Sequence, residues 1–168
     1  NKNILKTRIK NYLYNGVKLR KQRADKNIMT VLMCGQKKKD GIGSGIGNYL
    51  CCEILYRAKI SPHTTMETIY KSDDLLKTLA YYIKYTIKLA YLTNKTGYLG
   101  RNMTQFLKSH RKNISNKKTK DYHDDIDIGK DKFEYLVYRK NTDPDGNDVH
   151  KEEIIIKRTA HWVPDVQN

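Results

Sequence analysis

A glycine-rich stretch between Gln36 and Pro62 constrains this chain more than any other feature. Its glycines alternate with Ile or Ser and are Gly41, Gly43, Gly45 and Gly47. Asn48 follows them, and an amphipathic segment comes next. Because glycine lets a backbone turn sharply and approach another molecule closely, we expect a tight loop that leads directly into a helix.

The start of this expected helix has the features of an anion-binding site. Asn48 stands where a helix N-cap is expected. A run of lysines comes just before the glycines, namely Lys37, Lys38 and Lys39. Free N–H groups at a helix start, next to lysines, suit an anionic oxygen such as that of a phosphate. We therefore expect this loop to bind a nucleic-acid backbone.

The charge of the chain favours the same class of partner. The 168 residues include 33 Lys and Arg against 18 Asp and Glu, which gives a net charge of +15. An excess of this size indicates a polyanionic partner, with a merely solubilising surface as the alternative. A membrane partner is not expected, because the sequence has no interfacial helix rich in Trp, Phe and Leu and no apolar run of membrane-spanning length.

Cysteine and histidine predict no metal site and no cofactor. The three cysteines are Cys34, Cys51 and Cys52, which do not form a disulfide framework and indicate a reducing compartment. No Cys-x-x-Cys pair is present, and the five histidines show no ligand spacing. Cys51 and Cys52 fall on the apolar face of the helix after the glycines, so we expect them to be packing residues.

Apolar periodicity predicts several helices. The first 25 residues are loosely helical, with a break at Asn15-Gly16. Further helices are predicted over 26–35, capped by Asp25, over 48–59, over 64–70, and over 72–93, starting at Ser72. Residues 1–100 are thus expected to form a helical domain.

The rest of the chain changes character. Residues 101–132 are rich in basic residues and read as a flexible charged loop. Residues 133–168 are β: a strand over 133–139, a turn over 141–147, and a hairpin of 153–157 with 160–163. The hairpin tip has Lys157 and Arg158, which suit a groove or a phosphate, or else form an exposed charged turn. The predicted fold class is mainly α with a C-terminal β-hairpin.

Two segments resemble a known family. Gly45-Ile-Gly-Asn-Tyr-Leu50, followed by the segment Glu53–Pro62, resembles the helix–two-turn–helix of the formamidopyrimidine-DNA glycosylase/endonuclease VIII family. The C-terminal segments 137–139 and 157–167 resemble the terminal zinc-finger hairpin of that family. The resemblance implies a helix–two-turn–helix domain followed by a finger.

The resemblance also implies a function. Asn48 would hold the phosphate of the extruded nucleotide with help from backbone N–H groups, and Arg158 would bind the backbone near the lesion. The partner would be double-stranded DNA with oxidised bases or abasic sites, bound by a monomer. The expected location is inside the cell, and for a eukaryotic or viral protein it is the nucleus or the site of DNA replication. The full-length protein would be a base-excision-repair DNA glycosylase with abasic-site lyase activity. The residues expected to contact DNA are Asn48, Arg158, Gly45, Gly47, Tyr49, Lys37, Lys38, Lys39 and Lys157.

The sequence departs from the family in three ways. The finger cysteines are replaced, and Asp143, Gly146, Val163 and Val166 stand in their places, as in a zincless finger. The glycine turn is lengthened by 41–44. The family's nucleophile, an N-terminal proline amine followed by a glutamate, has no counterpart in Asn1-Lys2-Asn3, so we expect no catalytic residue in this chain. A non-enzymatic nucleic-acid-binding module and a ribosome-associated RNA binder remain the alternatives.

Overall fold

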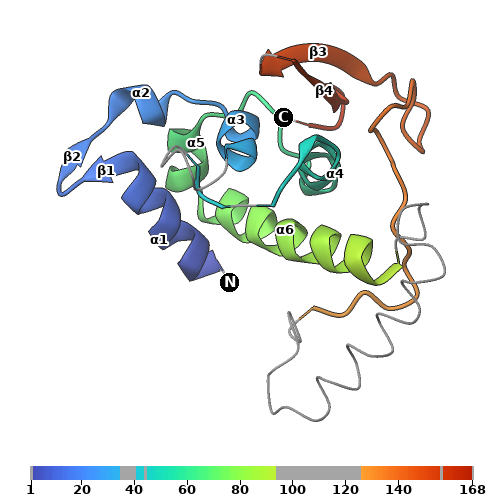
Figure 1. Ribbon diagram of the computed structural model, residues 1–168, viewed down its shortest axis with the longest axis horizontal. Coiled ribbons are helices and arrows are strands. Elements are labelled where there is room, and N and C mark those ends of the chain that lie inside the picture. Colours follow the sequence, from blue (N-terminus) through green and yellow to red (C-terminus); the bar gives the residue numbers. More distant parts are fainter. Residues whose placement is uncertain (1, 35–40, 44, 94–125, 156, 168) are drawn as a thin grey trace, which may run out of the picture. The chain divides into compact units, whose positions relative to one another are not determined.

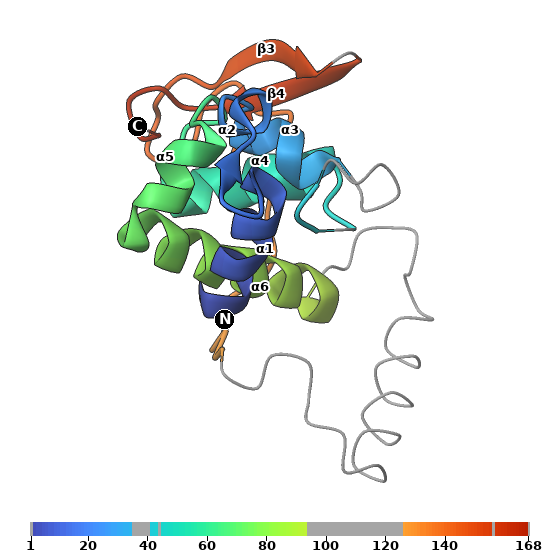
Figure 2. The same cartoon turned by 90° about the vertical axis from the view of Figure 1, so that its left-hand side faces the viewer.

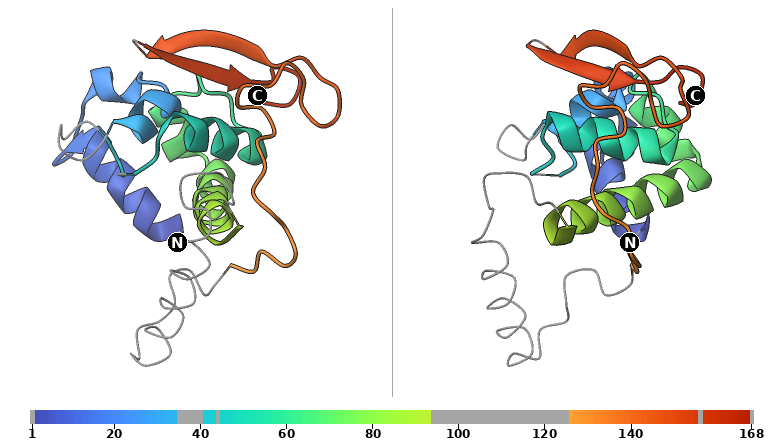
Figure 3. Two further views of the ribbon diagram at one scale, coloured as in Figure 1. Left: turned by 45° about the vertical axis from the view of Figure 1, so that its right-hand side comes forward. Right: turned by 90° about the vertical axis from the view of Figure 1, so that its right-hand side faces the viewer.

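The computed structural model describes residues 2–34, 41–43, 45–93, 126–155 and 157–167, with the backbone alone for 91–93. The chain divides into two compact units. Unit 1 consists of Asn1–Ile83 and Tyr135–Asn168, and unit 2 of Lys84–Glu134. Figures 1, 2 and 3 show the elements from four sides. The predicted division at 100 and 132 stays a prediction, since residue 100 and its neighbours lie outside the described residues.

Unit 1 begins with a helix, a small hairpin and one helical turn. These are α1 (Lys2–Leu13), β1 (Tyr14–Asn15), β2 (Lys18–Leu19) and α2 (Lys21–Ala24). The two strands are antiparallel, with Tyr14 opposite Leu19. Gly16 takes a φ of +60° in the turn, a conformation that glycine adopts readily and that tight hairpins require. The predicted break at Asn15-Gly16 is confirmed.

The next helices, α3 (Ile28–Met33) and α5 (Met66–Lys71), start side by side. Asn27 and Thr65 pair as an antiparallel β-bridge, and each caps its own helix. Asn27 Oδ1 accepts from the N–H of Thr30 at 2.8 Å, and Thr65 Oγ1 accepts from that of Thr68 at 3.2 Å. The predicted cap, Asp25, is wrong. The bridge keeps residue 27 extended, so the helix begins after it.

The central helix of unit 1 is α4 (Asn48–Ala58), as Figure 1 shows. Most of its side chains are buried, namely those of Leu50, Cys51, Cys52, Glu53, Ile54, Leu55, Tyr56 and Ala58. A helix buried on so many sides needs neighbours on each of them. It packs against α3 and against the C-terminal strand β4 (Arg158–Trp162). The predicted helix and its apolar face are confirmed.

Cys51 and Cys52 are packing residues, as predicted. They are 0% and 3% exposed. Burial raises the pKa of the Cys51 thiol, and it raises that of Cys52 to about 11. Both side chains therefore stay protonated at neutral pH, which removes the thiolate that reactive cysteines need.

The longest helix among the described residues is α6 (Asp73–Thr93), and the predicted Ser72 directly precedes it. The N–H of Leu75 donates to Ser72 Oγ at 3.2 Å. From Lys84 on, the helix belongs to unit 2, where Lys88 Nζ donates to the carbonyl of Ile126 at 2.8 Å. No helix among the described residues has the length and apolarity needed to cross a membrane.

The C-terminal arm, which we define as residues 135–167, ends in a hairpin of β3 (His150–Ile155) and β4. The strands pair antiparallel, from His150 opposite Trp162 to Ile155 opposite Arg158, with an irregular register between Glu153 and Ile155. The predicted hairpin is confirmed, but β3 starts at residue 150 and not at 153. Arg158 is the first residue of β4 and not part of the turn.

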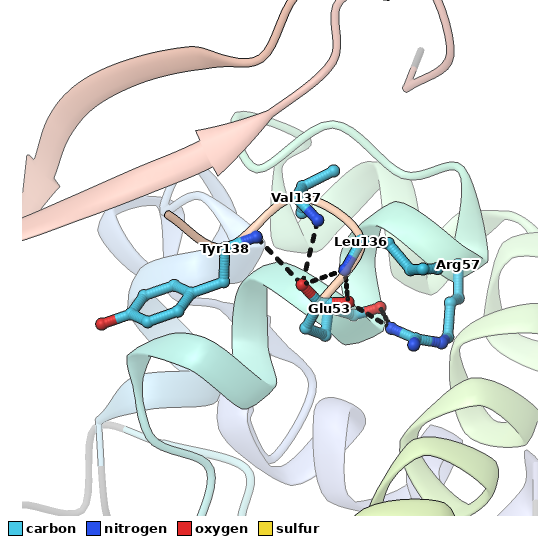
Figure 4. A network of polar contacts seen from close by, with 5 residues as sticks. All are labelled: Glu53, Arg57, Leu136, Val137 and Tyr138. Atoms are coloured by element: carbon cyan, nitrogen blue, oxygen red, sulfur yellow. Dashed lines mark hydrogen bonds and ion pairs between the residues drawn. The ribbon is translucent and has the colours of Figure 1, made fainter. Parts of the chain in front are cut away.

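The predicted strand over 133–139 is wrong. Residues 133–135 form no strand, and the chain then bends and turns through 136–139. The reason is Glu53, which is fully buried on α4. Its Oε1 accepts from the N–H groups of Leu136, Val137 and Tyr138 at 3.0, 3.1 and 2.9 Å (Figure 4). A carboxylate that gathers three successive N–H groups makes the backbone curve around it, so these groups cannot form a strand ladder.

Arg57 also binds this buried carboxylate. Its Nη1 pairs with Glu53 Oε2 and also donates to the Glu53 carbonyl at 3.1 Å, and its side chain is 9% exposed (Figure 4). Burying a carboxylate is costly unless charge and hydrogen bonds offset the lost hydration. Both are present here, so Glu53 fixes the start of the C-terminal arm to α4.

We expect Glu53→Gln to loosen the arm. The amide keeps the shape of the side chain but loses the charge, and it removes the carboxylate that pairs with Arg57. Removing one partner of a buried pair costs about 3 kcal/mol or more. Urea unfolding should be followed by fluorescence of Trp162, the chain's single tryptophan, which lies in β4, and by far-UV circular dichroism of the helices. We expect the fluorescence midpoint to fall below the helical one.

The matched control is Glu67→Gln. Glu67 forms an exposed pair with Lys71 at the same i, i+4 spacing, 2.7 Å apart. Exposed ion pairs contribute little to stability, so both unfolding midpoints of the Glu67→Gln variant should stay unchanged. Equal effects of the two substitutions would contradict the anchoring role of Glu53.

Candidate nucleic-acid interface

The loop before α4 combines buried side chains with open backbone. Ile42 and Ile46 are 5% and 9% exposed, which fixes the loop to the core. A side chain at Gly41 would collide with the carbonyl of Cys34, whereas one at Gly45 or Gly47 would meet open space. Gly45 is instead required by its φ of +84°. The open side of the loop leaves its backbone accessible to a partner.

The start of α4 is not capped by a side chain. The N-cap is Gly47, with φ −84° and ψ 176°, and Asn48 is the first helical residue, so the predicted N-cap at Asn48 is wrong. The first intrahelical bond runs from the N–H of Cys51 to the carbonyl of Gly47 at 2.9 Å. The N–H groups of residues 48–50 precede it and point out of the helix start, where an anion binds favourably.

Asn48 connects this helix start to the C-terminal hairpin. Its Nδ2 donates to the carbonyl of Thr159 at 2.9 Å. Its Oδ1 is buried and has no hydrogen-bond partner among the described residues. Thr159 directly follows Arg158, so the bond brings the backbone of β4 beside the glycine loop. The structure thus brings together the regions of Asn48 and Arg158, which the sequence singled out separately. The role of Asn48 as a phosphate ligand stays a prediction.

The exposed end of the hairpin is cationic. Lys157 has a φ of +62°, a left-handed turn conformation that is uncommon outside glycine. Lys157, Arg158 and Thr159 are all exposed, whereas the next residue, Ala160, is 1% exposed and packs inward. The N–H of His161 donates to Cys52 Sγ at 3.5 Å. The strand is therefore held to α4 just behind a free cationic end. Lys37, Lys38 and Lys39 lie outside the described residues.

Sequence reasoning missed an aromatic cluster beside the start of α4. Tyr49 lies 5.8 Å from Tyr135 and 6.2 Å from Tyr138, measured between ring centroids. Tyr138 also lies 5.0 Å from the His161 ring. Burial, together with the neighbouring tyrosines, raises the pKa of Tyr135. The only signal in the sequence is the count of 13 tyrosines against two phenylalanines. The cluster itself depends on the curve that Glu53 imposes on residues 136–138.

Two turns of the C-terminal arm are held by polar side chains. Asp143 is 5% exposed, and its carboxylate accepts from the N–H groups of Asp145 and Asn147, from Asn147 Nδ2, and from the Tyr56 hydroxyl at 3.0 Å. At the other turn, Gln167 Oε1 accepts from the N–H of Val163 at 2.8 Å, and its Nε2 donates to the carbonyl of Ile60 at 2.9 Å. These bonds connect both turns to α4 or to the residues that follow it.

Among the described residues, no group of three or more His, Cys, Asp or Glu could hold a metal ion. Gly146 has a φ of +90°, and Val163 is fully buried. At these positions and at Asp143, hydrogen bonds and apolar packing therefore hold the turns.

Comparisons with known proteins find a similar family and a similar fold. Residues 124–168 match the model of the formamidopyrimidine-DNA glycosylase C-terminal domain. The resemblance to that family is confirmed. The chain matches none of the curated proteins.

Solved structures share the fold over the whole chain. A viral DNA glycosylase is 19% identical, with a TM-score of 0.55, and the match covers 100% of this chain and 46% of that one. The Lactococcus lactis Fpg in complex with DNA containing an abasic site is 17% identical, with a TM-score of 0.54 and coverage of 100% and 48%. MutM in complex with DNA containing carbocyclic 8-oxo-G is 17% identical, with a TM-score of 0.53 and coverage of 100% and 47%. This chain therefore spans about half the length of the proteins it matches.

The fold class is confirmed as mainly helical with a C-terminal two-stranded hairpin, like the formamidopyrimidine-DNA glycosylase C-terminal domain. The glycine loop and the hairpin end meet within unit 1 of that fold.

We expect the C-terminal arm to loosen in acid because of Asp143. Burial alone would oppose ionisation of this carboxyl, but hydrogen bonds from Asn147, Tyr56 and Asp145 outweigh it and hold its pKa below the ordinary 3.8. A lowered pKa adds stability above pH 3.8 that is lost as the pH falls through the folded-state value. Asp143→Asn should therefore lower the thermal midpoint at pH 7, and the difference from the unmodified protein should shrink below pH 3.8.

The control for this titration is Asp145→Asn, which changes an exposed carboxylate two residues away. Its melting curves, recorded by Trp162 fluorescence between pH 7 and pH 2.5, should follow those of the unmodified protein. A constant difference for Asp143→Asn at every pH would show that ionisation of Asp143 is not what holds the turn.

Proposed function

We propose that this chain is the DNA-binding part of a DNA glycosylase and that it binds duplex DNA at a damaged or abasic nucleotide. The observation that carries the proposal is the bond from Asn48 Nδ2 to the carbonyl of Thr159. It unites two separate phosphate-binding features, the uncapped start of α4 and the cationic end of the β3–β4 hairpin. The net charge of +15 supports a polyanionic partner.

The proposed binding mode is a clamp on the DNA backbone. The N–H groups at the start of α4 donate to one phosphate, and Gly45 and Gly47 leave room for the backbone to approach it. Arg158 makes charge-assisted hydrogen bonds to a phosphate from the hairpin side, and Lys157 adds charge. Asn48 either donates to the phosphate or keeps β4 beside it, and Tyr49 lines the same surface. In family terms, the loop and α4 are a helix–two-turn–helix.

The C-terminal arm acts in this proposal as a zincless finger. Asp143, Gly146, Val163 and Val166 occupy the places expected for zinc-binding cysteines. Asp143 and Gln167 supply hydrogen bonds that take over the structural role of a metal. The hairpin then keeps a rigid end for Arg158 without a cofactor.

The chemistry belongs to the whole protein and to a part outside this chain. Solved structures with the same fold contain DNA with an abasic site or with carbocyclic 8-oxo-G, which supports oxidised or missing bases as the lesion. In the proposed reaction, an amine attacks the sugar carbon of a flipped nucleotide and displaces the base, and β-elimination then cuts the strand. This chain contributes backbone binding and no reacting group.

The second candidate is a nucleic-acid-binding module with the same fold that catalyses no reaction even as the full-length protein. It is favoured by the described site itself, which consists of groups that suit phosphate binding, namely the start of α4 and the cationic hairpin end. Borohydride reduction of the full-length protein on abasic DNA separates the two. A trapped covalent adduct supports the glycosylase, and its absence alongside tight binding supports the module.

We expect Arg158→Ala to weaken binding to an abasic duplex about tenfold or more, because it removes a charge-assisted contact. The slope of log affinity against log salt should fall by about 0.9, the value for one lost phosphate contact. Fluorescence anisotropy at several salt concentrations measures both quantities. Arg8→Ala removes an equal charge from an exposed position on α1 and is the control. Equal effects of the two substitutions would contradict a specific contact by Arg158.

We expect Asn48→Ala to weaken the same binding, because it removes the bond to Thr159 and releases β4 from the helix start. The loss should be about threefold to thirtyfold, the range for one or two hydrogen bonds. Isothermal titration calorimetry with abasic duplex gives this value. Thr159→Ala keeps the carbonyl that accepts the bond and should leave binding near its original strength, so an equal loss for both would assign the effect to the hairpin surface alone.

A further inference from the structure

A basic hollow lies on unit 1 in a part of the chain that the clamp does not use. It has a volume of about 660 Å³ and is lined by residues between Asn15 and Arg23. Its cationic lining residues are Lys18, Arg20, Lys21 and Arg23, and none of the described residues that line it is acidic. The hollow is formed by the β1–β2 hairpin and the helical turn α2.

The backbone and one arginine give this hollow a fixed wall. The N–H of Arg20 donates to the carbonyl of Leu13 at 2.8 Å, which closes the hairpin against the end of α1. Arg23 Nη1 donates to the carbonyl of Tyr12 at 3.2 Å, and its guanidinium lies 5.0 Å from the centre of the Tyr12 ring. A cation held in this way keeps its position without a ligand.

The other cationic side chains of the hollow form no ion pair with the described residues. Lys18 and Lys21 are exposed, and among the described residues no ion pair involves Lys18, Arg20 or Lys21. At the turn between the strands, Val17 is 99% exposed. The hairpin end therefore packs against nothing in the described chain. Concentrating like charges without a counter-charge costs stability, which a bound anion would offset.

We propose that this hollow binds a backbone phosphate of the same DNA duplex, away from the phosphates held at α4 and Arg158. This inference rests on the proposed function and extends the footprint of the protein on the duplex. In the left view of Figure 3, the β1–β2 turn, the described part of the loop before α4 and the turn end of the β3–β4 hairpin all lie toward the left of unit 1. One duplex on that side can reach all three.

The test compares two variants of equal charge on a duplex of 24 base pairs with one central abasic site. Lys18→Ala/Lys21→Ala removes two exposed lysines from the hollow, and Lys10→Ala/Lys77→Ala removes two exposed lysines from α1 and α6. Anisotropy is recorded across a salt series, and circular dichroism confirms the fold of each variant. We expect the hollow variant to lower the salt slope by about 1 to 2 and the affinity about tenfold, since each lost contact lowers the slope by about 0.9. The control variant should change the salt slope and the affinity far less.

The outcomes separate this inference from the proposed function. If both double variants behave alike while Arg158→Ala still weakens binding, the hollow is not a DNA contact and the proposed function stands. If the unmodified chain shows no salt-dependent binding to the duplex, both the inference about the hollow and the proposed function fail. An NMR titration with inorganic phosphate at constant ionic strength adds one further arm. Saturable shifts at residues 18–23, together with an unchanged DNA affinity of the hollow variant, would identify a small-anion site and overturn the DNA contact.

Discussion

The buried carboxylate of Glu53 is the constraint on which the arrangement of unit 1 depends. It comes from the middle of α4, accepts hydrogen bonds from the backbone of residues 136–138, and is neutralised by Arg57. A carboxylate removed from water must keep such partners. The C-terminal arm therefore cannot leave α4 without exposing a buried charge, and the hairpin that follows is held over the same helix.

The candidate binding surface follows from that anchor. With the arm fixed, Cys52 and Asn48 on α4 contact consecutive parts of β4, at His161 and Thr159. Asp143 and Gln167 hold the two turns of the arm to Tyr56 and Ile60. Arg158 therefore lies on a hairpin whose flanking turns are both held in place. Its neighbour Thr159 accepts a hydrogen bond from the uncapped start of α4. Among the described residues, the contacts that support this hairpin are hydrogen bonds to α4 and to Ile60.

Local patterns in the sequence predicted the helices well, and long-range contacts decided the rest. The apolar spacing in α4 and the serine before α6 are local signals, and both helices start where expected or within one residue of it. Asp25 looked like a cap because nothing local shows that Asn27 pairs with Thr65. Residues 133–139 alternate like a strand, but the N–H groups of 136–138 bond to a carboxylate 83 or more positions away in sequence. Glu53 and Arg57 stand four positions apart in the sequence, a spacing that suits an ion pair on a helix, but the sequence does not show that the pair is buried.

The central claim is that the start of α4 and the hairpin end act on the DNA backbone as one surface. A double-mutant cycle tests it most directly, with the binding free energy to abasic duplex measured for Asn48→Ala, Arg158→Ala and the double variant. If the two residues serve one surface, the loss for the double variant should differ from the sum of the single losses by about 1 kcal/mol or more. Losses that add to within about 0.5 kcal/mol, as for independent sites, would contradict the claim.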